Sequence, residues 1–168
     1  MTSNTSIELD IKIIAAQEKL LRFEHFDNTT AWALGNCLKD ICECRQASVV
    51  IEIRLAREMV FFYAMPGTSP ANADWARRKR NTVELLHQSS YAVGLKLITE
   101  GATLELKMGL PVRDFSTHGG SFPIYVNEVG CVGAVTISGQ PQREDHSIIV
   151  SALAQMCRIE ANAINLAE

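Results

Sequence analysis

The sequence predicts an α+β fold in which helices cover an antiparallel sheet. Apolar residues recur first at helical spacing, then form two runs rich in β-branched and aromatic residues, and later return to helical spacing before further strands and a closing helix. This order contains no repeated strand-helix-strand unit, which would indicate a parallel sheet. The 168 residues, 47% hydrophobic and 21% charged, are expected to form one domain, residues 1–168.

Two amphipathic helices are predicted at the start of the chain. From Ile7 to Leu21 the apolar residues follow one face of a helix, and the pattern breaks over Phe23 to Asp27. The second helix carries an apolar stripe from Ala31 to Cys42. Asp27 or Asn28 is placed to cap it, because a side-chain oxygen there can accept from the free N–H groups of the first turn.

A β-hairpin follows. Ser48 to Leu55 and Glu58 to Met65 are rich in β-branched and aromatic residues and are separated by a short polar gap, which favours an antiparallel pair. Pro66 to Pro70 is interpreted as a rigid turn, since its two prolines restrict the backbone.

The middle of the chain is expected to be helical. Asn72 or Asp74 is placed to cap a long helix from Trp75 towards Gln88, and the helical pattern resumes from Ser90 to Thr99. A short helical piece is predicted over Thr103 to Met108.

The last third combines strands with one helix. Glycines and β-branched residues from Gly119 to Gly139 predict two or three strands. Asp145 to Glu160 is amphipathic and is expected to close the fold as a helix.

Composition excludes several classes of protein. A formal charge of −3 argues against nucleic acid as a partner of the whole domain. Residues 1–10 lack the features of a secretory signal, and no apolar run is long enough to span a membrane, so we expect a cytoplasmic protein without membrane attachment. The five cysteines show no Cys-x-x-Cys spacing and are interpreted as reduced packing residues, with no metal site predicted.

Four basic residues stand in a row at Arg77, Arg78, Lys79 and Arg80. On a helix their side chains spread over about 300°, so they cannot all face one phosphate backbone. We therefore predict a solvated face with one or two inward cations instead of a nucleic-acid site.

The densest polar cluster in a glycine-rich setting is His118-Gly119-Gly120. Paired glycines let the backbone approach a ligand closely, and histidine can donate, accept or bind a metal. The same glycines are also typical of a bulge or a tight bend.

A second polar cluster, with Arg143, Asp145 and His146, lies where the closing helix begins. Arg143 could bind an anion together with the free N–H groups at that helix end. Alternatively, the acidic residues there form a solvated cap that interacts favourably with the helix dipole. Two strands joined by a tight turn would bring both clusters to one end of the sheet, with Lys79 and Thr82 as neighbours. A small-ligand site is predicted there; alternatively, these residues bridge subunits or brace turns.

The common catalytic motifs are absent, including Gly-x-Ser-x-Gly, the phosphate-binding loop and His-Glu-x-x-His. Catalytic residues are therefore unassigned, and whether the protein is an enzyme stays open. A hydrolase or lyase using His118 or His146 as a base lacks an identifiable nucleophile.

Several blocks resemble the GlcG/HbpS-type family, also called the haem-degrading domain family. The most similar branch is an uncharacterised conserved one. The resemblance extends from about Ile7 to Leu166. The matching blocks are FDNTTAWALG (26–35), MPGTSPAN (65–72), HQSSY (87–91), HGGSFPI (118–124) and SGQPQREDH (138–146).

This resemblance implies a profilin-like three-layer α/β/α sandwich with a five-stranded antiparallel sheet, assembled into homo-oligomers built from dimers. It implies two functions. The first is an oligomeric domain that binds a small anionic ligand or a protein partner, with no established activity. The alternative is a haem- or metal-binding protein linked to haem degradation, as in the wider family, so haem is the cofactor to be tested.

The two middle helices also carry more apolar residues than a small sheet needs to bury, which favours association. These residues are Trp75, Val83, Leu86, Tyr91, Leu95 and Ile98.

Overall fold

The computed structural model describes residues 4–160 and 164–166. Its helices are α1 (Asn4–Leu20), α2 (Asn28–Cys44), α3 (Pro70–Leu86), α4 (Ser90–Glu100), α5 (Leu104–Met108) and α6 (Gln142–Cys157). Its strands are β1 (Arg22–Phe23), β2 (Val50–Leu55), β3 (Glu58–Ala64), β4 (Ser121–Val126) and β5 (Gly130–Ser138).

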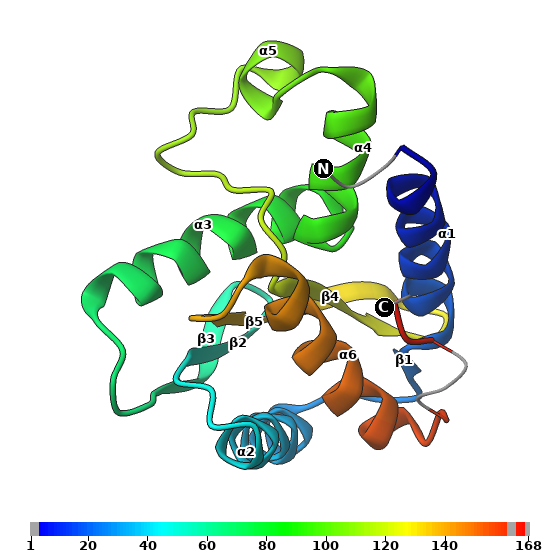
Figure 1. Ribbon diagram of the computed structural model, residues 1–168. Coiled ribbons are helices and arrows are strands. Elements are labelled where there is room, and N and C mark those ends of the chain that lie inside the picture. Colours follow the sequence, from blue (N-terminus) through cyan, green and yellow to red (C-terminus); the bar gives the residue numbers. More distant parts are fainter. Residues whose placement is uncertain (1–3, 161–163, 167–168) are drawn as a thin grey trace.

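The fold has three layers (Figure 1). Helix α3 lies against one face of the sheet, while α2 and α6 pack together on the other face. Helix α1 packs beside α4, and the segment after α5 returns past α3 to reach β4. The predicted α/β/α sandwich is therefore confirmed.

The strands within the described residues form one mixed sheet in the order β1-β4-β5-β2-β3. The pairs β2 with β3, β2 with β5 and β4 with β5 are antiparallel. Strand β1 instead runs parallel to β4, with Arg22 opposite Tyr125. The expectation of a purely antiparallel sheet was wrong at this edge, because a two-residue strand is too short to show the alternation by which strands are recognised.

The two faces of the sheet differ in chemistry, since alternate residues of a strand point to opposite sides. On the side of α2 and α6, Ile51 and Ile53 of β2 pack into the main apolar core with Leu153 of α6. On the side of α3, Glu52 accepts a hydrogen bond from the guanidinium of Arg80 at 2.8 Å. Helix α3 therefore lies on a sheet face that buries charged groups, and the candidate site is at one end of this layer.

Helix α3 begins earlier than expected. It begins at Pro70 and not near Trp75, and the N–H of its N-cap residue Ser69 donates to Asn72 Oδ1 at 2.9 Å. The sequence interpretation assigned Pro70 to a turn and gave the cap to Asn72 or Asp74. Proline is well suited to the first helical position, where the absent N–H would have no helical partner.

Other element boundaries follow the sequence more closely. The N-cap of α2 is Asp27, as predicted, with its Oδ1 2.8 Å from the backbone N of Thr30. The hairpin of β2 and β3 and the separate helix α4 are confirmed. Helix α6 begins at Gln142 and not at Asp145. No helix in the described ranges is long and apolar enough to span a membrane.

Candidate ligand-binding site

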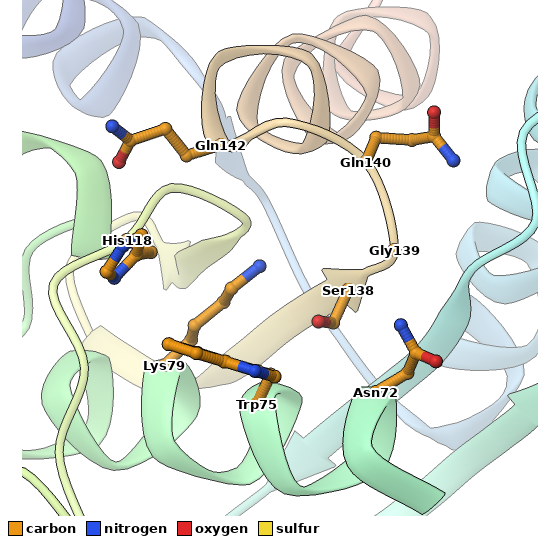
Figure 2. A pocket seen from close by; sticks show the side chains of 8 residues that line it. All are labelled: Asn72, Trp75, Lys79, His118, Ser138, Gly139, Gln140 and Gln142. Atoms are coloured by element: carbon orange, nitrogen blue, oxygen red, sulfur yellow. The ribbon is translucent and has the colours of Figure 1, made fainter. Parts of the chain in front are cut away.

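A cavity of about 240 Å³ opens between the first turns of α3, the end of β5 and the start of α6 (Figure 2). Helix α3 supplies three side chains at spacings of three and four, which share one face of a helix. The segments flanking the sheet supply the others. The lining residues are Asn72, Trp75, Lys79, His118, Ser138, Gly139, Gln140 and Gln142.

A buried ion pair borders this cavity. Lys79 Nζ lies 2.8 Å from Asp145 Oδ2 and also donates to the backbone oxygen of Ile137 at 3.3 Å. The Lys79 and Asp145 side chains are 5% and 0% exposed. Burial lowers the pKa of Lys79 and raises the pKa of Asp145, while the attraction between the two charges opposes both changes.

The backbone of the turn after β5 holds the Asp145 carboxylate. The N–H of Gln140 donates to Oδ1 at 3.1 Å, and the N–H of Gly139 donates to Oδ2 at 3.4 Å. Because the carboxylate accepts three donors in all, its position against the Lys79 amine is well defined.

The predicted glycine pair is needed for close approach. A Cβ on Gly119 would lie 2.3 Å from the backbone oxygen of Gln142. A Cβ on Gly120, which has φ +118°, would lie 2.7 Å from Lys79 Nζ and 2.6 Å from the oxygen of Ile137. The glycines therefore let the chain before β4 pass directly against α6 and the ion pair.

His118 forms one wall of the cavity. Its ring meets the ring of Trp75 edge-on at a centroid distance of 5.0 Å, and its Nδ1 is 3.1 Å from Ser116 Oγ. The guanidinium of Arg78, which does not line the cavity, stacks over the Trp75 ring with its Cζ 4.2 Å from the ring centroid. Burial, followed by the charges of Lys79 and Arg78, lowers the pKa of His118. The imidazole is therefore neutral at pH 7.

The other predicted site residues lie outside the lining. Thr82 Oγ1 donates to the backbone oxygen of Ser116 at 2.8 Å and so ties α3 to the segment before β4. Arg143 forms a two-pronged ion pair with Asp10 of α1. His146 is 1% exposed and is turned towards α1. The structure thus gathers Lys79, the glycines, His118 and Asp145, and it directs the remaining three elsewhere.

The row of basic residues divides as predicted into outward and inward side chains. Lys79 and Arg80 are buried and paired with carboxylates, which confirms the inward cations. Arg77 contacts Asp74 and the segment before β4, and Arg78 donates to a backbone oxygen of that segment.

The sequence interpretation missed several lining residues. Asn72 and Trp75 had been given local roles in helix capping and in starting a helix, while Ser138 and Gln140 had been given no part in a site. Gln142 Oε1 accepts from the N–H of Gly119 at 3.3 Å. The available signal was the family resemblance, since these positions lie in or beside the blocks MPGTSPAN and SGQPQREDH.

The arrangement combines a cationic amine, a neutral imidazole and amide groups around a small space. This set can bind an oxygen-rich molecule and can exchange protons through Lys79, Asp145 and His118. Among residues 4–160 and 164–166, no cluster of three or more histidine, cysteine or acidic side chains is placed to hold a metal ion.

A larger hollow of about 830 Å³ lies on the opposite side of the fold, between α2 and α6. It is lined mainly by helix residues and includes Cys37, Cys44 and Arg45. Cys37 Sγ lies 3.4 Å from Gln155 Oε1, and burial raises the pKa of this thiol.

Comparison with known families shows which proteins the chain resembles. Residues 26–154 match a family described as "Haem degrading protein HbpS-like". A "UPF0303 protein" of Serratia proteamaculans (strain 568) is 49% identical over 95% of this chain and 99% of its own. "UPF0303 protein R02983" of Rhizobium meliloti (strain 1021) is 48% identical over 96% of this chain and 98% of its own.

Solved structures share the fold. The crystal structure of Ybr137w protein has a TM-score of 0.82 and 25% identity, covering 88% of this chain and 87% of that one. A PduOC:Heme complex has a TM-score of 0.64 and 22% identity, covering 82% of this chain and 93% of that one. The crystal structure of HbpS has a TM-score of 0.63 and 16% identity, covering 79% and 89%.

Proposed function

The chain belongs to the HbpS-like family of haem-degrading proteins, and from that premise we propose that it binds a small carboxylate or other oxyanion in the cavity between α3 and α6. The supporting observation is the buried amine of Lys79 at the cavity. Two of its three N–H bonds are directed to Asp145 and Ile137, which leaves one for a ligand.

The other lining groups favour the same ligand class. Asn72, Gln140 and Gln142 can donate from their amides without adding charge. The volume of about 240 Å³ is below the roughly 300–1,000 Å³ of sites for drug-sized molecules. The ligand is therefore a metabolite of a few heavy atoms.

Thermal unfolding in the presence of lactate, acetate or inorganic phosphate tests this proposal. A ligand at one hundred times its Kd should stabilise the folded protein by about 2.7 kcal/mol. His118→Leu, at a residue that lines the cavity, should weaken that effect, whereas Lys96→Met, at an exposed residue of α4, should keep it. If none of these anions raises the melting temperature, or if His118→Leu and Lys96→Met respond alike, the cavity is not the binding site.

Haem binding is the second candidate function, and the observation that favours it is the hollow between α2 and α6. Haem does not fit the polar cavity beside His118, because that space is below the range for drug-sized ligands. The hollow of about 830 Å³ is large enough for haem; Cys37 or Cys44 would supply a thiolate to the iron, and Arg45 would pair with a propionate. The raised pKa of Cys37 opposes thiolate ligation at that position, and Cys44 is the more exposed of the two thiols, so it is the one tested.

Haemin titration tests this second candidate. We expect a Soret band that saturates at one haem per chain and that changes position in Cys44→Ser, with Cys131→Ser on the opposite side of the fold as the control. A wild-type protein without a saturable Soret band would exclude haem binding.

Assembly into homo-oligomers built from dimers, in the cytoplasm, is also part of the proposal. Of the six apolar residues first taken to mark an association surface, Val83, Tyr91 and Leu95 are buried within the chain. Other exposed apolar side chains support the proposal, namely Trp32 of α2 and Phe62 of the edge strand β3, which are 65% and 51% exposed. Light scattering should give a multiple of 18.5 kDa, and cell fractionation tests the location.

A further inference from the structure

We propose that Lys79 forms an imine with the carbonyl group of a small oxo acid bound in the cavity between α3 and α6. The inference rests on the proposed binding of a small carboxylate there and adds a covalent reaction to it. The geometry that supports it is a nucleophile beside a proton acceptor at the edge of a space that a ligand can enter.

Lys79 differs from every other lysine of the chain. All six lysines lie in the described ranges, and Lys79 alone is buried. Its amine nevertheless borders the cavity, and Figure 2 shows the side chain extending from α3 between His118 and Ser138. Burial lowers its pKa, which increases the fraction of the neutral amine that can attack a carbonyl carbon.

Asp145 is placed to take the proton that this attack requires. Its Oδ2 lies 2.8 Å from Lys79 Nζ, and two backbone N–H groups hold the carboxylate in place. Burial raises the pKa of Asp145. The pKa of this carboxyl therefore lies closer to that of the buried amine than the pKa of an exposed carboxyl does, which favours proton transfer between them. Proton transfer between the two converts a buried ion pair into two neutral groups, which a dry site favours.

The reaction balances without any other reactant. The Lys79 ammonium transfers a proton to Asp145, and the nitrogen lone pair forms a bond to the carbonyl carbon. The carbonyl oxygen takes the second proton of the amine and becomes a hydroxyl. Asp145 returns its proton to that hydroxyl, the C–O bond breaks and water leaves. The product is one protonated imine, which keeps the third proton of the ammonium, and one water molecule, with no oxidant or reductant consumed.

The cavity walls would orient an oxo acid for this step. The neutral imidazole of His118 faces the same space and can donate to or accept from the carbinolamine hydroxyl. Gln142 and Asn72 offer amide donors for the carboxylate at a distance from the amine. Close packing of Gly120 against Lys79 Nζ limits the directions in which the amine can move.

Reductive trapping tests the inference on the full chain. The protein is incubated with pyruvate and sodium cyanoborohydride, and the adduct is located by peptide mass spectrometry. We expect one adduct per chain on Lys79 before any surface lysine reacts. Lys79→Arg should abolish this adduct, whereas Lys96→Arg, a matched change at an exposed lysine, should leave it intact. Asp145→Asn should slow trapping of pyruvate, because the acceptor for the Lys79 proton is removed.

The outcomes separate this inference from the proposed function. Because Lys79→Arg disturbs a buried ion pair, protection is measured in the wild-type protein as well, where excess lactate should block the Lys79 adduct. If pyruvate and lactate both stabilise the protein but labelling is spread over surface lysines, the imine inference is wrong and the binding proposal stands. If neither ligand stabilises the protein and Lys79 is not labelled, both are wrong.

Discussion

His146 Nε2 lies 2.8 Å from Gln17 Oε1 and so joins α6 to α1 inside the protein. Since the amide oxygen accepts, the ring donates through Nε2, and Gln17 Nε2 in turn donates to the backbone oxygen of Ile164 at 2.6 Å. The other ring nitrogen, Nδ1, is buried without a hydrogen-bond partner in the described part of the chain. Protonation would therefore place an uncompensated charge in the core, and burial lowers the pKa of His146 to about 3.

This relationship predicts acid sensitivity. The unfolded chain takes up a proton on His146 near pH 6.5 and the folded chain only near pH 3, so the stabilising contribution is lost as the pH falls between these values. From pH 7 to pH 5 the loss should be about 2 kcal/mol in the free energy of unfolding. Urea unfolding of wild type and His146→Gln at both pH values checks this, with exposed His25→Gln as the control. An equal pH dependence in wild type and His146→Gln would contradict it.

Gly120 is predicted to be intolerant of a side chain for two separable reasons. Gly120 and Gly130 have similar positive φ values, +118° and +105°, but a Cβ on Gly130 would meet nothing within 4 Å. Both alanine substitutions strain the backbone, because a residue with a Cβ disfavours a positive φ. Only the new methyl group of Gly120→Ala would also overlap Lys79 Nζ and the backbone oxygen of Ile137. Gly120→Ala should therefore be roughly 1–3 kcal/mol less stable than Gly130→Ala. Thermal unfolding measures the difference, and equal melting temperatures would show that the site accommodates the extra methyl group.

His118 should titrate below the ordinary histidine pKa of 6.5. Burial is the main cause, and the charges of Lys79 and Arg78 add to it. NMR titration of the ring protons should give a midpoint below 6.5 that rises in Arg78→Met, since one repelling charge is removed. Lys39→Met, at a residue of α2 away from the site, should leave the midpoint unchanged. A wild-type midpoint at or above 6.5 would mean that the imidazole is not shielded in solution.

The cysteines should not affect stability through oxidation. All five are free, and burial raises the pKa of Cys42 and of Cys157 to about 11, so neither is a thiolate at neutral pH. Melting temperatures with and without a strong reductant should differ by less than roughly 5 °C, equivalent to about 2 kcal/mol for a chain of this length. Iodoacetamide should label exposed Cys44 before Cys42, and the reverse order would contradict the burial of Cys42.

Local patterns carried most of the information about the elements. The β-branched and aromatic residues of Ser48 to Leu55 and Glu58 to Met65 identified a strand pair, and Asp27 was one of two residues named as the cap, because capping depends on residues a few positions apart. The patterns failed where local chemistry is ambiguous. Pro70 is as compatible with a turn as with the first position of a helix, and β1 is too short to alternate.

The candidate site was predicted only in outline. The glycine pair and the start of the last helix were expected to meet, and Gly119 does approach Gln142. The sequence also indicated that one or two cations of the basic row face inward. It could not indicate that Lys79 would pair with Asp145 while Arg143 would turn to Asp10, because each arginine or lysine has the same local features whichever carboxylate it meets.

The sequence by itself therefore determined the helices, the longer strands, the family and the residue types available at the site. Only the tertiary structure decided which charged groups meet. Secondary structure follows from contacts between residues a few positions apart, so it is encoded in local periodicity. The Lys79 to Asp145 and Arg143 to Asp10 pairs join residues 66 and 133 positions apart, and such pairs depend on the path of the whole chain through the three layers.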